Sequence, residues 1–99
     1  MSKLESDFQQ KLIEDLERIY PNRMDTTITK FEDIPGYPDI LILHKDKWAM
    51  LECKKETASS KRPNQDFYIN KLNNMSFARF IHPENKQEVL NELQSALPT

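Results

Sequence analysis

Two short apolar runs that follow each other closely constrain the fold of this chain more than any other feature. Residues 38–43 read PDILIL and residues 48–54 read WAMLECK. Nearly continuous apolar runs of this length are typical of strands that are covered on both faces. Because only residues 44–47 separate the two runs, the sequence predicts a β-hairpin whose loop holds four residues or only Lys45 and Asp46.

The acids and the lysine of this hairpin are the candidate functional residues. For either loop length, the simplest register pairs Leu43 with Trp48 and Asp39 with Glu52. Side chains alternate along a strand, so Lys54 falls on the same face as Glu52. Directly opposed positions hold their Cβ atoms about 4.5–5.5 Å apart, and two carboxylates at that spacing repel each other unless they share a cation.

A hard divalent cation would remove this repulsion. Oxygen ligands favour Mg²⁺ or Mn²⁺ over Zn²⁺, and the chain has no His/Cys cluster with zinc spacing. The alternative is a charged hairpin rim, in which Asp39 only begins a strand and residues 52–56 run out into solvent. The hairpin by itself leaves both interpretations open.

The length of the chain predicts one domain, spanning residues 1–99. A chain of this size buries roughly 60–65% of its unfolded surface, which is enough for one core. The single cysteine, Cys53, excludes an internal disulfide, and no apolar stretch is long enough to span a membrane. Since the first residues do not resemble a signal peptide, we expect a cytoplasmic protein.

The rest of the chain predicts three helices and two further strands. Pro35 and Gly36 are typical of a type II turn that leads into Asp39. Apolar periodicity, β-branched runs and turn residues then define the remaining elements: a helix at 3–19, a strand at 26–31, a helix from Pro63 to about 74, a strand at 77–82 and a last helix carrying Val89, Leu90, Leu93 and Leu97. The predicted order is αβββαβα.

Two polar residues lie on helix faces that are otherwise apolar. Glu5 falls inside the stripe of the first helix, near Leu12 and Leu16, and could contribute to a site. It could equally form a capping box with Ser2. Gln65 shares a face with apolar residues of the second helix, but periodicity alone favours an exposed position in the first turn.

Positive charge is concentrated in one part of the chain. The formal net charge is −2, yet residues 54–79 carry a local excess of +4. Within it, Lys55, Lys61 and Arg62 directly follow the strand that bears Glu52. They would contact a nucleic-acid backbone, or they form an ordinary solvated loop.

Pro38-Asp39 together with Glu52-Cys53-Lys54 resembles the paired motif of the PD-(D/E)xK phosphodiesterase superfamily. Within it, the chain is similar to the VRR-NUC branch and to phage or archaeal Holliday-junction resolvases, although residues 77–80 lack the Val-Arg-Arg signature. The resemblance implies an α/β, restriction-endonuclease-like core with a central mixed four-stranded sheet flanked by helices. It also implies the following roles: Asp39 and Glu52 as metal carboxylates, the main-chain carbonyl of Cys53 as a further ligand, Glu5 as the acid of the first helix acting through water or a second ion, Lys54 as the motif lysine, and Gln65 as the helix glutamine.

These observations predict a Mg²⁺-dependent DNA endonuclease, with Mn²⁺ as a substitute, that acts on branched or Holliday-junction DNA. A symmetric junction would suit a homodimer, which we therefore expect. One alternative is a sequence-specific nicking, homing or restriction-type endonuclease. Another is a non-catalytic nucleic-acid-binding module that retains the fold.

Overall fold

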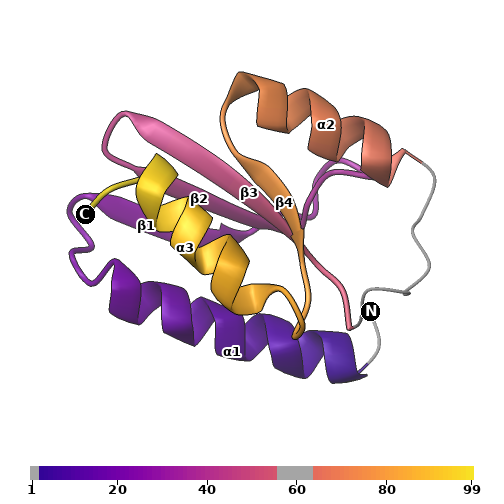
Figure 1. The fold of residues 1–99 in the computed structure, drawn as a ribbon, viewed down its shortest axis with the longest axis horizontal. Helices are drawn as coiled ribbons and strands as arrows, with labels where there is room; N and C mark the ends of the chain where they lie inside the picture. The colour runs from indigo at the N-terminus through magenta and orange to yellow at the C-terminus, as the bar shows by residue number, and fades with distance from the viewer. Residues whose placement is uncertain (1–2, 56–63) are drawn as a thin grey trace.

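The computed structural model describes residues 3–55 and 64–99, and these form an α/β fold (Figure 1). The elements follow the predicted order αβββαβα: α1 (Lys3–Ile19), β1 (Thr26–Lys30), β2 (Ile40–His44), β3 (Lys47–Cys53), α2 (Gln65–Met75), β4 (Ala78–Ile81) and α3 (Lys86–Ala96). The first and last predicted strands are one or two residues too long at their ends. The predicted start of the second helix at Pro63 lies outside the described residues.

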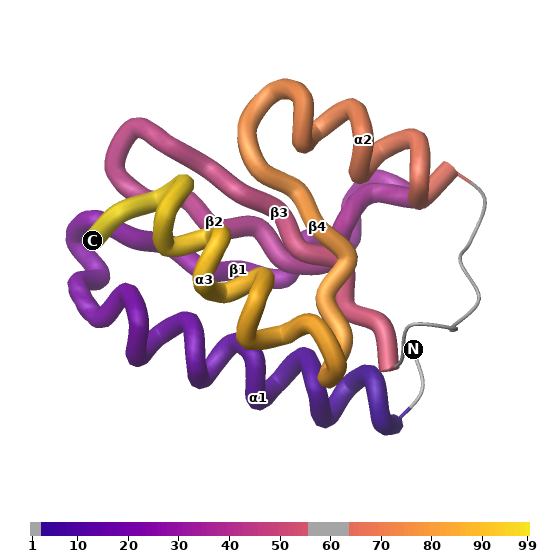
Figure 2. The backbone as a smooth tube through the Cα atoms, viewed as in Figure 1, coloured from indigo at the N-terminus to yellow at the C-terminus, as the bar shows by residue number. Residues whose placement is uncertain are grey.

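The four strands form one mixed sheet in the order β1-β2-β3-β4. Neighbouring strands are antiparallel in the first two pairs, whereas β3 and β4 are parallel. A parallel pair cannot be joined by a tight turn, and α2 lies in the connection between these two strands. Figures 1 and 2 show α1 and α3 on one side of the sheet and α2 on the other.

The central hairpin has the predicted register. Leu43 pairs with Trp48, and Lys45 and Asp46 form the two-residue loop, which settles the loop length. Lys45 adopts a positive φ of 57°, as tight hairpin loops often require. The ladder ends at the pair Ile40–Leu51, so one further step places Asp39 across from Glu52 at the mouth of the hairpin.

Side-chain alternation along β3 divides the interior into two apolar clusters. Leu51 and Cys53 belong to the larger cluster with α1 and α3, whose other members include Leu12, Leu16, Ile81 and Leu93. Met50 points the opposite way, into a smaller cluster with Ile69 and Leu72 of α2. By the same alternation, Glu52 and Lys54 project on the α2 side of the sheet. The fold therefore turns the two charged residues toward the first turn of α2.

The turn before Asp39 has the predicted type II form. The Tyr37 amide donates to the Ile34 carbonyl at 3.1 Å, and Gly36 between them has a φ of +89°. A Cβ atom at Gly36 would also come within 3.1 Å of ring carbons of Tyr68 on α2. Glycine is thus required twice, for the backbone conformation and for the close approach that packs this turn against α2.

Candidate active site

A buried polar cluster joins the end of β3 to the start of α2. Lys54 Nζ donates to Gln65 Oε1 at 2.8 Å, and Gln65 Nε2 donates to Glu52 Oε2 at 3.0 Å. Lys54 Nζ lies 3.9 Å from the same Glu52 oxygen. The three residues are only 6%, 1% and 3% exposed in the order Lys54, Gln65 and Glu52. Gln65 therefore holds the ammonium and the carboxylate in a fixed relation.

The position of Gln65 corrects one interpretation of the sequence. Helical periodicity alone favoured an exposed residue in the first turn, and this is wrong, because Gln65 is among the most deeply buried residues described. A side chain in the first turn of a helix is exposed only when nothing packs against it. Here the end of β3 supplies Glu52 and Lys54 as hydrogen-bond partners.

Asp39 is held beside this cluster by the backbone of β3. The Cys53 amide donates to Asp39 Oδ1 at 3.2 Å. The other oxygen, Oδ2, is buried and has no hydrogen-bond partner within residues 3–55 and 64–99. Burial raises the pKa of Asp39 from 3.8 to about 6, although the Cys53 amide and the Lys54 charge act in the opposite direction. An acceptor oxygen is thus buried without a donor.

Cys53 serves the site through its backbone. Its side chain is fully buried in the cluster beneath α1 and α3. Burial, followed by the charges of Asp39, Glu52 and Glu5, raises the pKa of its thiol well above the ordinary value. The thiol therefore stays protonated and is a poor metal ligand, because metals bind the thiolate. Only the main-chain carbonyl of Cys53 remains as a candidate ligand.

Glu5 lies at the same end of the sheet. It is half-buried in the first turn of α1, and its charge acts on the Cys53 thiol. Figure 1 shows this end of α1 next to the end of β3. The inward-facing position predicted from the apolar stripe is therefore supported. Ser2, on which the capping-box alternative depends, lies outside the described residues.

The carboxylates suit a cation that needs few protein ligands. Within residues 3–55 and 64–99, no three His, Cys, Asp or Glu side chains are grouped closely enough to hold a metal ion. Glu5 is therefore not assembled with Asp39 and Glu52 into a three-carboxylate site. Mg²⁺ commonly uses one or two carboxylates and keeps several waters. Asp39, with its unbonded Oδ2, and Glu52 fit that donor set.

The predicted backbone-binding residues are only partly covered by the structure. Lys55 is exposed and directly follows Lys54. Lys61 and Arg62 lie outside the described residues. In the described part of the chain, every helix is too short or too polar to cross a membrane.

Sequence reasoning missed Gln9. This residue lies on α1, one helical turn after Glu5, and is only 4% exposed. It lines a hollow of about 280 Å³ together with Asp39, Phe31 and Tyr37. The available signal was its spacing from Glu5, since residues i and i+4 share one face of a helix.

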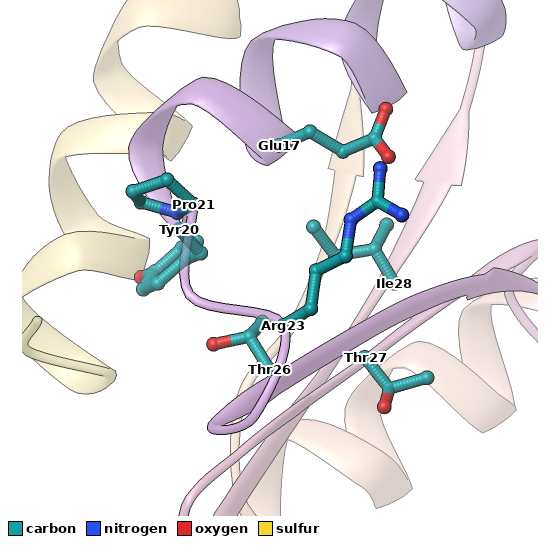
Figure 3. A pocket seen from close by; sticks show the side chains of 7 residues that line it. All are labelled: Glu17, Tyr20, Pro21, Arg23, Thr26, Thr27 and Ile28. Atoms are coloured by element: carbon teal, nitrogen blue, oxygen red, sulfur yellow. The ribbon is translucent and has the colours of Figure 1, made fainter.

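A second hollow, of about 500 Å³, lies at the other end of β1 (Figure 3). Tyr20, Thr26 and Ile28 contribute to its lining, and the Arg23 side chain points toward Glu17 across its mouth. None of the predicted site residues lines this hollow. It lies beside the outer edge of the sheet and is separate from the polar cluster.

Comparison with known proteins adds no assignment: no family model matches the chain, and no curated protein or solved structure gives a significant match.

Proposed function

We propose that this protein is a Mg²⁺-dependent DNA endonuclease with a restriction-endonuclease-like core of the PD-(D/E)xK type. The observation that carries the proposal is the buried Lys54–Gln65–Glu52 cluster with Asp39 beside it. The element order and the mixed sheet are compatible with that core.

The energetic cost of the cluster supports a functional role. Removing one ionised side chain from water costs several kcal/mol. The attraction of a close opposite charge returns roughly the same amount. Glu52 and Lys54 are both almost fully buried, and Asp39 adds a second acid whose Oδ2 lacks a donor in the described chain. A small domain gains little stability from such an arrangement. Perturbed, buried ionisable groups are common at active sites.

Each residue has a distinct task in phosphodiester hydrolysis. Asp39, Glu52 and the Cys53 carbonyl would hold the divalent ion, which supplies charge stabilisation and a more acidic water when bound. Lys54 orients the attacking water and offsets negative charge that develops on the phosphate oxygens. Gln65 positions Lys54 through its 2.8 Å hydrogen bond. Glu5 acts from the side of α1 through water.

Branched DNA, such as a Holliday junction, is the proposed substrate. A domain of 99 residues has little surface with which to read base sequence. Lys55 and the predicted contacts of Lys61 and Arg62 would bind phosphates without sequence preference. Recognition would then depend on the shape of the DNA.

The two edges of the sheet differ in how their outward backbone groups are covered. On β4, Asn73 Oδ1 accepts from the Ala78 amide, Arg79 Nη1 donates to the Ala78 carbonyl, and Asn85 Nδ2 donates to the Phe80 carbonyl. Side chains thus cover the outward backbone groups of this edge, which is a common defence against strand addition.

The β1 edge is more open. The Phe31 amide and the Asp25 carbonyl form hydrogen bonds on the side of β1 that faces β2. Because backbone groups alternate between the two sides of a strand, those of the even-numbered residues Ile28 and Lys30 face outward. Two copies of β1 could pair in an antiparallel arrangement centred on Ile28. In this arrangement Thr26 of one copy lies opposite Lys30 of the other, so no like charges are brought together. We infer that a second copy of this chain pairs here, with the hollow of Figure 3 at the interface.

Cleavage assays test the proposed function. A four-way junction and a linear duplex of equal sequence are incubated with protein and Mg²⁺, Mn²⁺ or EDTA. We expect metal-dependent cutting of the junction, loss of cutting in Glu52→Gln and Lys54→Met, and normal cutting in Glu88→Gln, whose carboxylate is exposed on α3. Cutting at one fixed sequence in both substrates would support the sequence-specific alternative. Binding without cutting under all metal conditions would support the non-catalytic module.

A further inference from the structure

Gln9 is a polar residue on the buried face of α1. It is 4% exposed, and it lines the hollow that also contains Asp39. A carboxamide offers two donors and one acceptor oxygen, with which a ligand in the hollow could form hydrogen bonds. Leu12 and Leu16, on the same side of the helix, are conventional core residues. An apolar residue at position 9 would therefore be expected if packing were its only role.

The hollow that Gln9 lines has a mixed polar and aromatic character. Phe31 and Tyr37 form one wall, with their ring centroids 5.8 Å apart and their planes inclined by 36°. Asp39 is also part of the lining, and its Oδ2 is the acceptor that lacks a donor in the described chain. At about 280 Å³, the hollow is near the lower end of the range of small-molecule sites.

The aromatic wall packs against α2. Tyr37 contacts Tyr68 of α2 at a centroid distance of 4.5 Å. Gly36, next to Tyr37, packs closely on the same Tyr68 ring. The wall is therefore supported by the helix that carries Gln65, so the hollow and the polar cluster share one scaffold.

We propose that this hollow binds a single unpaired nucleobase, which stacks on the aromatic wall and hydrogen-bonds to Gln9. The inference rests on the proposed nuclease function, because Asp39 lines both the hollow and the candidate metal site. A base held here lies next to the phosphodiester that is cut. Gln9 is then a specificity-determining residue for DNA that offers an unpaired base.

The chemistry of the lining favours a nucleobase over other small molecules. All four bases present adjacent donors and acceptors on one edge, which a carboxamide can match, and a flat face that stacks on aromatic side chains. Stacking on an aromatic residue contributes about 1–3 kcal/mol per base, with little preference for its identity. A base-paired nucleotide cannot enter, because both its faces and its edge are already engaged. The pocket therefore selects branch points and single-stranded ends.

Nucleotide binding can be measured without cleavage. ¹H–¹⁵N NMR spectra of the full chain are recorded while dAMP or dTMP is added in EDTA. We expect shifts of the Gln9 side-chain amide and of the Phe31 and Tyr37 backbone amides. Gln9→Leu should weaken binding roughly five- to tenfold, as loss of a hydrogen bond in a desolvated site implies. Gln10→Leu, on the exposed face of the same helix, should bind as the wild type does.

Cleavage then connects the hollow to the proposed function. A junction with an abasic site beside the scissile phosphate should be cut more slowly by the wild type, whereas Gln9→Leu should cut the two junctions at similar rates. Tyr37→Leu keeps an apolar side chain at the wall and checks stacking separately from Gln9.

Each result bears on the inference. Absence of nucleotide shifts at Gln9, or equal affinities in Gln9→Leu and Gln10→Leu, overturns it and shows that the hollow holds only water. Cleavage that persists in that case leaves the nuclease proposal standing. Nucleotide binding at Gln9 in a protein that cuts no DNA supports the pocket and overturns the nuclease.

Discussion

Asp39→Asn should make the protein more stable while removing its activity. Burial raises the pKa of Asp39 from 3.8 to about 6, so the folded state binds this proton more tightly than the unfolded state does. The contribution of Asp39 to the free energy of unfolding is therefore most favourable below pH 4, and it falls as the pH rises toward 6. Above pH 6 the protein carries the whole cost of a buried charge.

The magnitude follows from the two pKa values. A shift of two units corresponds to about 3 kcal/mol, at 1.36 kcal/mol per unit. Asparagine removes the charge and keeps an oxygen for the Cys53 amide, but its own amide group would be buried in place of Oδ2. Burying this amide group costs about 1–2 kcal/mol, which offsets part of the gain from removing the charge. We therefore expect a net gain of about 1–2 kcal/mol at pH 8, or a Tm increase of roughly 5–15 °C for a domain of this size.

Thermal and urea unfolding at pH 4, 6 and 8 without divalent ions measures this effect. The difference between Asp39→Asn and the wild type should be small or negative at pH 4 and positive at pH 8. Asp46→Asn is the control, since Asp46 is exposed and a hydrogen bond from Lys47 lowers its pKa. That variant should show no rise in Tm at pH 8. A stability difference for Asp39→Asn that does not change with pH would refute the reasoning.

Three further predictions follow from other parts of the molecule. Gly36→Ala should lower the free energy of unfolding by about 2 kcal/mol in urea titrations, because it combines a positive φ with a close approach to Tyr68; unchanged stability would contradict the turn described. Lys30→Pro removes an outward-facing amide and should convert a dimer to a monomer in sedimentation experiments while the fold is retained; a dimer that persists would exclude pairing through β1. Lys61→Ala should weaken DNA binding and reduce its log–log salt slope by about 1 while single-turnover cleavage stays near normal; a rate loss like that of Lys54→Met would assign Lys61 to the chemistry.

The order of elements and the hairpin register could be predicted because both depend on local signals. Strand alternation fixes Lys54 on the face of Glu52 whatever the loop length, and the proline-glycine pair specifies its turn type. The pairing of Leu43 with Trp48 was confirmed for the same reason. The boundaries of the strands were less certain, since the last residues of a run are decided by neighbours outside it.

The burial of the site residues could not be predicted from local patterns. Gln65 is buried because β3 ends against the first turn of α2, and its hydrogen-bond partner Lys54 lies 11 positions away in the sequence. Gln9 was passed over because a glutamine inside an amphipathic helix usually marks the exposed face. The spacing of Gln9 from Glu5 distinguishes it from Gln10, because residues i and i+4 share one face of a helix.

Binding of Mn²⁺ tests the central claim most directly. Electron paramagnetic resonance measures free Mn²⁺ as protein is added, and needs neither a substrate nor cleavage. The account predicts that the wild type and Glu88→Gln bind the ion, and that Asp39→Asn and Glu52→Gln each lose most of this binding. A wild-type protein that leaves millimolar Mn²⁺ free, or variants that bind as the wild type does, would contradict it.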